Sequence, residues 1–218
     1  MPVKKRIMIV EDHPIFRLGL SELINQEDDL FVCGEAEDII KAGNDIKTLK
    51  PDMVIVDISL KGRSGIELVK DINKNFKSMP VLVLSMHDES IYAERALVAG
   101  AKGYIMKQEA SESIIKAIRC VLGGKIYASE SIMGNILNKF VGQPNMKDKP
   151  AVERLTDREL EVFQFAGQGL TTKEIADRLN LSKKTIGTYR ERIKEKLGLK
   201  NSAELIRFAV HWVKHEDR

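Results

Sequence analysis

The stretch IMIV at residues 7–10 runs directly into Glu11 and Asp12, and it decides how the rest of the chain is interpreted. Three later stretches have the same form: MVIV (53–56) ends on Asp57, VLVL (81–84) on Ser85, and GYIM (103–106) on Lys107. Continuous apolar runs of this length are typical of parallel strands that are buried on both faces. Ligands of open α/β sheets bind outside the carboxyl ends of such strands, so these polar side chains are expected to converge in one pocket.

Helical periodicity fills the intervals between these runs. The first helix, Pro14 to Asn25, is expected to place Ile15, Leu18, Leu23 and Ile24 on its buried side. A further strand is expected at 30–33, and further helices at 39–49, 66–76 and 91–98 and around the stripe Ile114, Ile115, Ile118, Val121 and Leu122. Five strands alternating with five helices predict an α/β fold with a doubly wound, five-stranded parallel sheet of order 2-1-3-4-5, as in flavodoxin.

The chain divides by composition into two domains and a linker. Gly123 and Gly124 end the first domain, which is expected to span residues 1–124. Residues 125–152 are interpreted as a linker that carries a helix near 129–141, because residues 142–151 (GQPNMKDKPA) have almost no apolar content. Residues 153–218 show four helical patterns and predict an all-α second domain with a helix-turn-helix.

Charge distinguishes the two parts of the chain. Residues 1–125 carry 18 Lys/Arg against 19 Asp/Glu, whereas residues 126–218 carry 17 against 13, so the net charge of +3 comes from the second part. A basic second half favours contact with a polyanion, although a solvated mixed-charge surface is the plainer alternative. No apolar run is long enough for a membrane span, and Cys33 and Cys120 are expected to be buried thiols, so a cytoplasmic protein without a membrane partner is expected.

The strand ends predict a cation and phosphoryl site. Glu11, Asp12 and Asp57 at one mouth would repel one another, and a hard cation such as Mg²⁺ with oxygen ligands relieves that repulsion. Lys107 and Ser85 are suited to neutralise and hydrogen-bond a phosphoryl group, which makes Asp57 a candidate nucleophile. Alternatively, Glu11 and Asp12 only cap the following helix, and Lys107 is a structural counter-ion to Asp57.

Residues 4–124 resemble the receiver domain of two-component response regulators, on Glu11-Asp12, Asp57, Gly65, Ser85 and the stretch AGAKGY (99–104) that leads to Lys107. The resemblance implies that Asp57 accepts phosphate from a sensor histidine kinase. It also implies that Mg²⁺ is bound by Asp12, Asp57 and the backbone carbonyl of Ser59, with Glu11 acting through water. Ser85 and Tyr104 are implied as the pair that switches its packing on phosphorylation, with Lys107 on the phosphate.

The second half carries a composite motif. Thr156 and Glu159 form a capping-box pattern, and Ser182 is expected to cap a helix from Lys183 to Leu197 that stops at Gly198. Residues 173–200 hold nine Lys/Arg against four Asp/Glu. A basic helix that follows a shorter one across the turn at 179–181 has the form of a helix-turn-helix. The apolar members Ile175, Ala176, Leu179, Ile186, Ile193 and Leu197 are interpreted as core.

Residues 153–215 resemble the LuxR-type DNA-binding domain of the NarL/FixJ family. The resemblance implies that helix 183–197 enters the major groove of double-stranded DNA and that residues 203–213 pair two copies in a dimer. Thr188, Glu191 and Arg192 are the candidates for base contacts. The expected DNA-binding residues are Lys173, Lys183, Lys184, Thr185, Gly187, Thr188, Tyr189, Arg190, Glu191 and Arg192.

The favoured interpretation is a phosphorylation-controlled transcription regulator that is not a conventional enzyme and forms homodimers when phosphorylated or on DNA. Two alternatives stay open. The receiver can be a docking module of a DNA-binding regulator that works without phosphorylation. A Mg²⁺-dependent phosphatase with an aspartate nucleophile is disfavoured, because its second aspartate would fall at Ser59.

Overall fold

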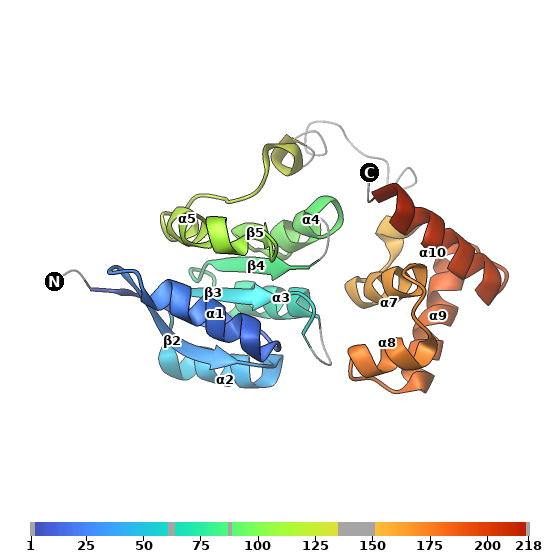
Figure 1. Cartoon of the computed structure of the whole chain (residues 1–218), viewed down its shortest axis with the longest axis horizontal. Helices are drawn as coiled ribbons and strands as arrows, with labels where there is room; N and C mark the ends of the chain where they lie inside the picture. Colours follow the sequence, from blue (N-terminus) through green and yellow to red (C-terminus); the bar gives the residue numbers. More distant parts are fainter. Residues whose placement is uncertain (1–2, 61–63, 87–88, 135–150, 217–218) are drawn as a thin grey trace. The chain divides into compact units, whose positions relative to one another are not determined.

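The protein is described by a computed structural model that covers residues 3–60, 64–86, 89–134 and 151–216. The chain forms two compact units, residues 1–140 and residues 141–218 (Figure 1). Each unit is considered separately below.

The first unit is an α/β domain built on one five-stranded sheet. Its strand order is β2-β1-β3-β4-β5 and every neighbouring pair is parallel, which confirms the predicted order. The strands are β1 (Lys5–Val10), β2 (Leu30–Ala36), β3 (Met53–Asp57), β4 (Val81–Ser85) and β5 (Gly103–Met106). The helices are α1 (Pro14–Asn25), α2 (Ile39–Leu49), α3 (Gly65–Asn75), α4 (Glu89–Ala99) and α5 (Ala110–Leu122).

Helices cover both faces of this sheet. On one face, α1 and α5 enclose a core in which Leu20, Ile24 and Ile118 pack against Ile7, Ile55 and the other inward residues of the strands. On the other face, α3 contacts both α2 and α4. Because the central strands are buried on both sides, their sequences read as unbroken apolar runs.

The predicted buried side of α1 is wrong for three of its four residues. Ile15 is 89% exposed, Leu18 62% and Leu23 37%, whereas Ile24 is fully buried. The helix is apolar on more than one side, and the positions spaced by four residues, Phe16, Leu20 and Ile24, face the sheet. The expected burial of Cys33 and Cys120 is also wrong, because both are half-buried, Cys33 on the edge strand β2 and Cys120 on α5; both are free thiols, as expected.

The loop after β3 is held tightly against the strand by Gly65. The Gly65 backbone N–H donates to the carbonyl of Ile58 at 2.7 Å. A Cβ at residue 65 would lie 1.9 Å from the carbonyl oxygen of Asp57, so only glycine fits this approach. Through this contact the start of α3 is positioned against the end of the strand that carries Asp57.

The segment after α5 adds one isolated bridge to the edge of the sheet. Tyr127 pairs in parallel with Gly103, its N–H donates to the carbonyl of Lys102 at 2.9 Å, and its carbonyl accepts from the N–H of Tyr104 at 2.9 Å. Residues 130–134 are helical, as expected for the start of the helix near 129–141. The rest of that helix and most of the predicted linker lie outside the described residues.

The second unit is all-α. Its elements are the short 3-10 helix η1 (Ala151–Arg154), α7 (Asp157–Gly167), α8 (Thr172–Arg178), α9 (Lys183–Leu197) and α10 (Ser202–Glu216). The predicted capping box of Thr156 and Glu159 is present, and Ser182 caps α9 by accepting from the Thr185 N–H. Helix α9 ends at Gly198, which has φ +68° as a left-handed cap requires. The predicted helix boundaries of α9 are therefore confirmed.

The helices of the second unit share one core. The Phe163 ring of α7 packs in a tilted arrangement against the rings of Phe208 and Trp212, with centroids 5.8 Å and 5.4 Å away, and thereby joins α7 to α10. Ile175, Ile186 and Ile193 are fully buried, which confirms their interpretation as core. In the turn between α8 and α9, Asn180 adopts a left-handed conformation with φ 51°. In the part of the chain that the structure describes, no helix is both long and apolar enough to cross a membrane.

Candidate functional site

The carboxyl ends of the strands bring the predicted polar residues together. Glu11 and Asp12 follow β1, Asp57 ends β3, Ser85 ends β4, and Lys107 follows β5. All five are buried: Glu11, Asp57 and Ser85 are 0% exposed, and Asp12 and Lys107 are 8% exposed. Lys107 is placed by its backbone N–H, which donates to the Ser85 carbonyl at 2.7 Å. The expected pocket therefore exists as a buried group of charges.

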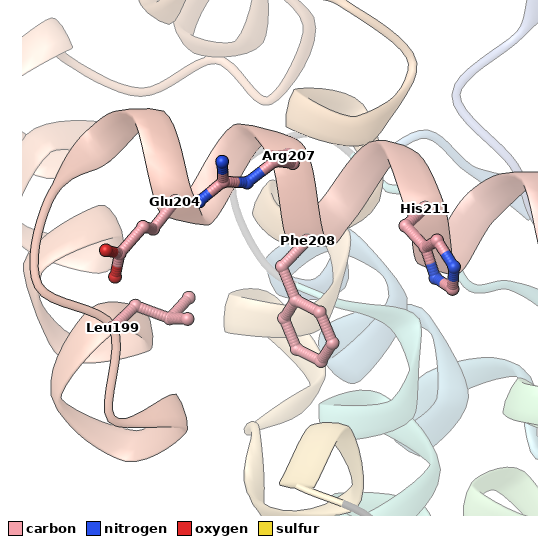
Figure 2. A pocket seen from close by; sticks show the side chains of 5 residues that line it. All are labelled: Leu199, Glu204, Arg207, Phe208 and His211. Atoms are coloured by element: carbon pink, nitrogen blue, oxygen red, sulfur yellow. The ribbon is translucent and has the colours of Figure 1, made fainter.

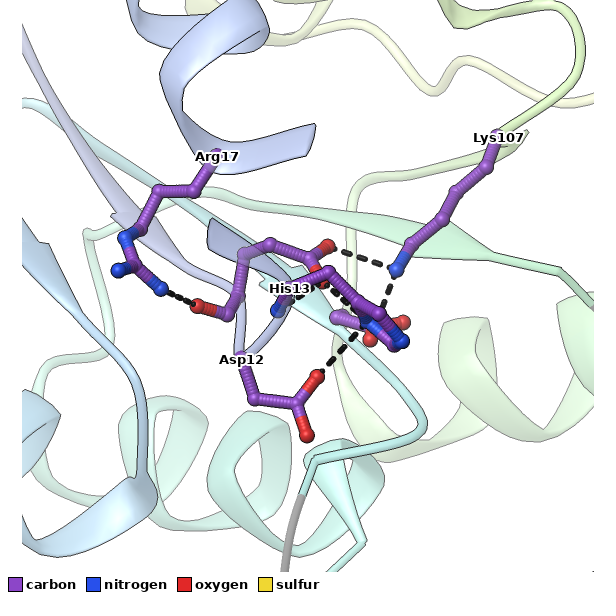
Figure 3. A network of polar contacts seen from close by, with 6 residues as sticks. Asp12, His13, Arg17 and Lys107 are labelled. Atoms are coloured by element: carbon purple, nitrogen blue, oxygen red, sulfur yellow. Dashed lines mark hydrogen bonds and ion pairs between the residues drawn. The ribbon is translucent and has the colours of Figure 1, made fainter. Parts of the chain in front are cut away.

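Lys107 bridges two of the carboxylates (Figure 3). Its ammonium Nζ lies 2.9 Å from Asp57 Oδ2 and 2.7 Å from Glu11 Oε2. Both contacts are ion pairs, and hydrogen bonds from the Lys107 ammonium and the Ser59 backbone N–H to the Asp57 carboxylate act to lower the pKa of Asp57. The Lys107 ammonium also lies 4.9 Å from the centroid of the Phe16 ring, where the face of the ring attracts a cation.

The pKa values reflect the crowding of charges. Burial and the neighbouring Glu11 carboxylate raise the pKa of Asp57 to about 6, although Lys107 acts in the opposite direction. Burial disfavours the charge on Lys107, but Asp57 and Glu11 outweigh it and raise the pKa of the ammonium. Asp57 is thus a carboxylate whose charge lacks full compensation from the protein.

The group of residues fits a divalent cation. Among the described residues, three buried carboxylates face a single ammonium, and this excess of negative charge is costly without a further cation. Asp12 Oδ1 is a buried carboxylate oxygen that has no hydrogen-bond partner among the described residues. Oxygen ligands of this kind suit Mg²⁺. Ligand atoms of Glu11, Asp12, Asp57 and also His13 lie within 4.8 Å of one another.

His13 and Arg17 belong to this site and were not predicted from the sequence. The backbone N–H of His13 and its ring Nδ1 both lie 3.0 Å from Glu11 Oε1. Arg17 donates to the backbone carbonyl of Glu11 (Figure 3). It also pairs with Glu35 at 3.3 Å. Their closeness to the acidic pair in sequence was the available signal, but a helix start explains such residues equally well. The structure shows that they hold Glu11 in place.

The remaining predicted residues of the pocket lie on the same edge or next to it. Ser59 is half-buried two residues beyond Asp57. Tyr104 is 2% exposed on β5 and is paired with Val83, two residues before Ser85. The predicted switch pair therefore lies on two adjacent strands, with the Tyr104 ring buried.

The predicted DNA-binding residues lie on α9 and at the start of α8. Lys173, Lys183, Lys184, Thr188, Glu191 and Arg192 are exposed, and Thr185, Gly187, Tyr189 and Arg190 are half-buried. Helix α9 thus has a buried side, which includes Ile186 and Ile193, and a basic exposed side. This arrangement leaves cationic side chains available for a phosphate backbone.

Three polar contacts within the second unit were not predicted. Arg190 Nη1 donates to Thr172 Oγ1 at 2.9 Å and so ties α9 to α8. Lys196 pairs with Glu159 of the capping box at 2.6 Å and ties α9 to α7. Glu191 pairs with Lys194 at 2.8 Å. The phosphate contact expected of Arg190 stays a prediction, and the structure gives this residue a bracing contact within the helix-turn-helix.

Comparison with known proteins agrees with both halves of this description. Residues 7–119 match the response regulator receiver domain, and residues 153–209 match the luxR family of bacterial regulatory proteins. The chain belongs to the NarL/FixJ family of response regulators. This response regulator therefore joins a receiver domain to a LuxR-type DNA-binding domain, as the two resemblances implied.

Several relatives match nearly the whole response regulator. The oxygen regulatory protein NreC of Staphylococcus aureus is 34% identical over 209 residues, which are 94% of this chain and 96% of the relative. RcsB of Salmonella enterica serovar Typhimurium, solved on promoter rprA with the phosphomimetic BeF₃⁻, has a TM-score of 0.61 at 28% identity and covers 95% and 98% of the two chains. A structure of two RcsB dimers on two parallel DNAs has a TM-score of 0.56 at 29% identity, with 94% and 97% covered.

Helix α10 carries a shallow cavity of about 330 Å³ (Figure 2). It is lined by Leu199, Glu204, Arg207, Phe208 and His211. Ile206 on the same helix is 42% exposed. The helix that the resemblance assigns to pairing of two copies thus presents apolar surface next to charged side chains.

Proposed function

We propose that this response regulator is phosphorylated at Asp57 by a sensor histidine kinase and that phosphorylation controls its binding to promoter DNA as a homodimer. The observation that supports the proposal is the environment of Asp57. Its carboxylate is fully buried between Lys107 and the acidic pair, and burial together with the neighbouring Glu11 carboxylate raises its pKa. Such a carboxylate is placed to react, not to stabilise the fold.

In the proposed reaction, an Asp57 carboxylate oxygen attacks the phosphorus of the kinase phosphohistidine. The new bond joins the phosphoryl group to the Asp57 oxygen as the bond to the histidine nitrogen breaks, and the ring, protonated on its other nitrogen, leaves as neutral imidazole. Lys107, now 2.9 Å from Asp57, would pair with a phosphoryl oxygen, and the Ser85 hydroxyl would donate to another.

Asp12, Asp57 and the Ser59 carbonyl would hold the Mg²⁺, with Glu11 acting through water. When bound, Mg²⁺ supplies positive charge to the phosphoryl oxygens. Lys107 meanwhile keeps Glu11 and Asp57 in fixed positions, because its ammonium contacts both. The Phe16 ring limits where that ammonium can move.

The proposed output follows from β4 and β5. Movement of Ser85 toward a phosphoryl group would leave space that the Tyr104 ring on the adjacent strand can occupy. This change in the packing of Tyr104 would carry the effect of phosphorylation from the pocket to a distant surface. The regulator would then dimerise and place two α9 helices in successive major grooves. NreC and RcsB support this proposal as relatives, and RcsB is a protein solved on promoter DNA.

The test measures the oligomeric state of the full-length chain in solution, from its molar mass, and its affinity for DNA. Beryllofluoride with Mg²⁺ is expected to convert the wild-type protein to a dimer and to increase its affinity for DNA fragments selected from its genome. Asp57→Asn is expected to show neither change. If wild type and Asp57→Asn dimerise and bind the same fragments equally with and without beryllofluoride, the regulator works without phosphorylation.

A further inference from the structure

His13 occupies an unusual place for a residue at the start of a helix. It is the N-cap residue of α1, yet its side chain makes no capping hydrogen bond. The ring instead turns toward the acidic pair: Nδ1 lies 3.0 Å from Glu11 Oε1 and 2.9 Å from Asp12 Oδ1 (Figure 3). The ring is placed by the pocket and not by the helix end.

One of these two contacts shares no proton. Nδ1 carries at most one hydrogen, and its hydrogen-bond geometry is met by Glu11 Oε1. Asp12 Oδ1 is buried without a hydrogen-bond partner among the described residues, although Nδ1 lies 2.9 Å away. In the tautomer that carries its proton on Nε2, the Nδ1 lone pair faces both carboxylate oxygens, as ligands of one ion do.

The spacing matches that of two ligands on one ion. Neighbouring ligands of an octahedral ion, with bonds of about 2.1 Å, lie about 3.0 Å apart. The ligand atoms of Glu11, Asp12, His13 and Asp57 are within 4.8 Å of one another. Opposite ligands at about 2.1 Å from an ion lie about 4.2 Å apart, so the largest distance between these ligand atoms would shorten by a fraction of an ångström when an ion binds. The buried Asp12 Oδ1, which has no hydrogen-bond partner among the described residues, points independently to an ion here.

We propose that His13 Nδ1 is a nitrogen ligand of the acidic pocket, so that the pocket binds first-row transition ions such as Co²⁺ and, more weakly, Mn²⁺ through a contact that Mg²⁺ does not use. Imidazole nitrogen favours first-row transition ions, whereas carboxylate and carbonyl oxygens suit Mg²⁺. In the bound state the ring proton would sit on Nε2. The inference rests on the proposed cation site, and it adds a ligand and an ion class to that site.

The experiment measures the affinity of Co²⁺ and of Mg²⁺ by titration calorimetry on the full-length, tag-free chain, for wild type, His13→Gln and the control His211→Gln. Residue 13 has a side chain that is 65% exposed, so His13→Gln is expected to fold. His13→Gln should weaken the affinity for Co²⁺ by about tenfold or more and leave the affinity for Mg²⁺ unchanged. Tenfold is the smallest loss expected when a residue that only supports a metal ligand is removed, so loss of a ligand should cost at least as much. His211→Gln should leave both affinities of the acidic pocket unchanged, and any Co²⁺ held by His211 and His215, four residues apart on α10, is fitted as a separate site.

A spectroscopic readout tests the ligand directly. With Mn²⁺ bound to wild type, pulsed electron paramagnetic resonance should detect coupling to a ring nitrogen, and His13→Gln should lose it. Equal loss of Co²⁺ and Mg²⁺ affinity in His13→Gln would overturn the proposal, because His13 would then act only by positioning the carboxylates. Unchanged Co²⁺ affinity or absent nitrogen coupling would overturn it as well. If wild type binds none of the three ions, the cation site of the proposed function fails too.

Discussion

The Lys107 ammonium lies 2.9 Å from Asp57 Oδ2 in the buried pocket and simultaneously contacts Glu11. Replacing Lys107 by glutamine would leave two buried carboxylates without their counter-ion. We expect Lys107→Gln to lower the free energy of unfolding by about 3–5 kcal/mol in urea, measured without divalent ions. Added Mg²⁺ should restore part of this loss.

The exposed neighbour Lys102 provides the matched control, since it lies just before β5 and outside the pocket. Lys102→Gln should change the free energy of unfolding by less than about 0.5 kcal/mol. An equal effect of both substitutions would show that Lys107 is not the counter-ion of the pocket.

Asp57→Asn is expected to stabilise the receiver in the absence of metal. Because the folded protein raises the pKa of Asp57 from 3.8 to about 6, the ionised form opposes folding at neutral pH. Asparagine should therefore raise the free energy of unfolding at pH 7.5 by about 1–3 kcal/mol.

The stability difference between wild type and Asp57→Asn is expected to depend on pH. In the folded wild type, Asp57 takes up a proton as pH falls through about 6, so the destabilisation by its ionised form decreases. This destabilisation is absent below 3.8, where the unfolded chain is protonated as well. The advantage of Asp57→Asn should therefore shrink between pH 7 and pH 4 in urea titrations. A difference that stays constant over this range would contradict a raised pKa.

Gly65 is expected to tolerate no side chain. A Cβ there would lie 1.9 Å from the Asp57 carbonyl oxygen, so the backbone must shift to accept alanine. We expect Gly65→Ala to destabilise the receiver by about 1–3 kcal/mol and to slow phosphorylation of Asp57. Gly19→Ala is the control, because Gly19 lies inside α1 with nothing within 4 Å of its Cβ position. It should stabilise the protein by about 0.5–1 kcal/mol.

The topology and the pocket were accessible from the sequence because their signals are local. Each buried parallel strand reads as an apolar run, and the residue that follows it must lie at the carboxyl edge. Which side of α1 is buried could not be predicted as well. Its apolar residues lie on more than one side, and only packing against the sheet selects Phe16, Leu20 and Ile24 over Ile15 and Leu18.

Contacts between side chains distant in sequence were also beyond prediction. The pairs Arg190–Thr172 and Lys196–Glu159 depend on how three helices cross, which no periodicity specifies. The place of His13 in the pocket depends on which way its ring turns at the start of α1. Periodicity locates the elements, and tertiary packing decides these contacts.

Lys184 is expected to contribute to DNA affinity through a phosphate contact. It is exposed at the start of α9, on the side away from the core. Lys184→Ala should weaken binding to all DNA sequences about equally and reduce the slope of log affinity against log salt by about 0.9. Lys214→Ala, an exposed lysine on α10, is the control and should leave both unchanged. A loss confined to particular bases would assign Lys184 to base contacts instead.

The most direct test of the central claim is phosphorylation of the purified full-length chain by acetyl phosphate with Mg²⁺, followed by intact mass spectrometry. The wild type should gain the mass of one phosphoryl group, and Asp57→Asn, which retains Glu11, Asp12, Ser85 and Lys107, should gain none. Equal labelling of wild type and Asp57→Asn would contradict the assignment of Asp57 as the phosphoacceptor.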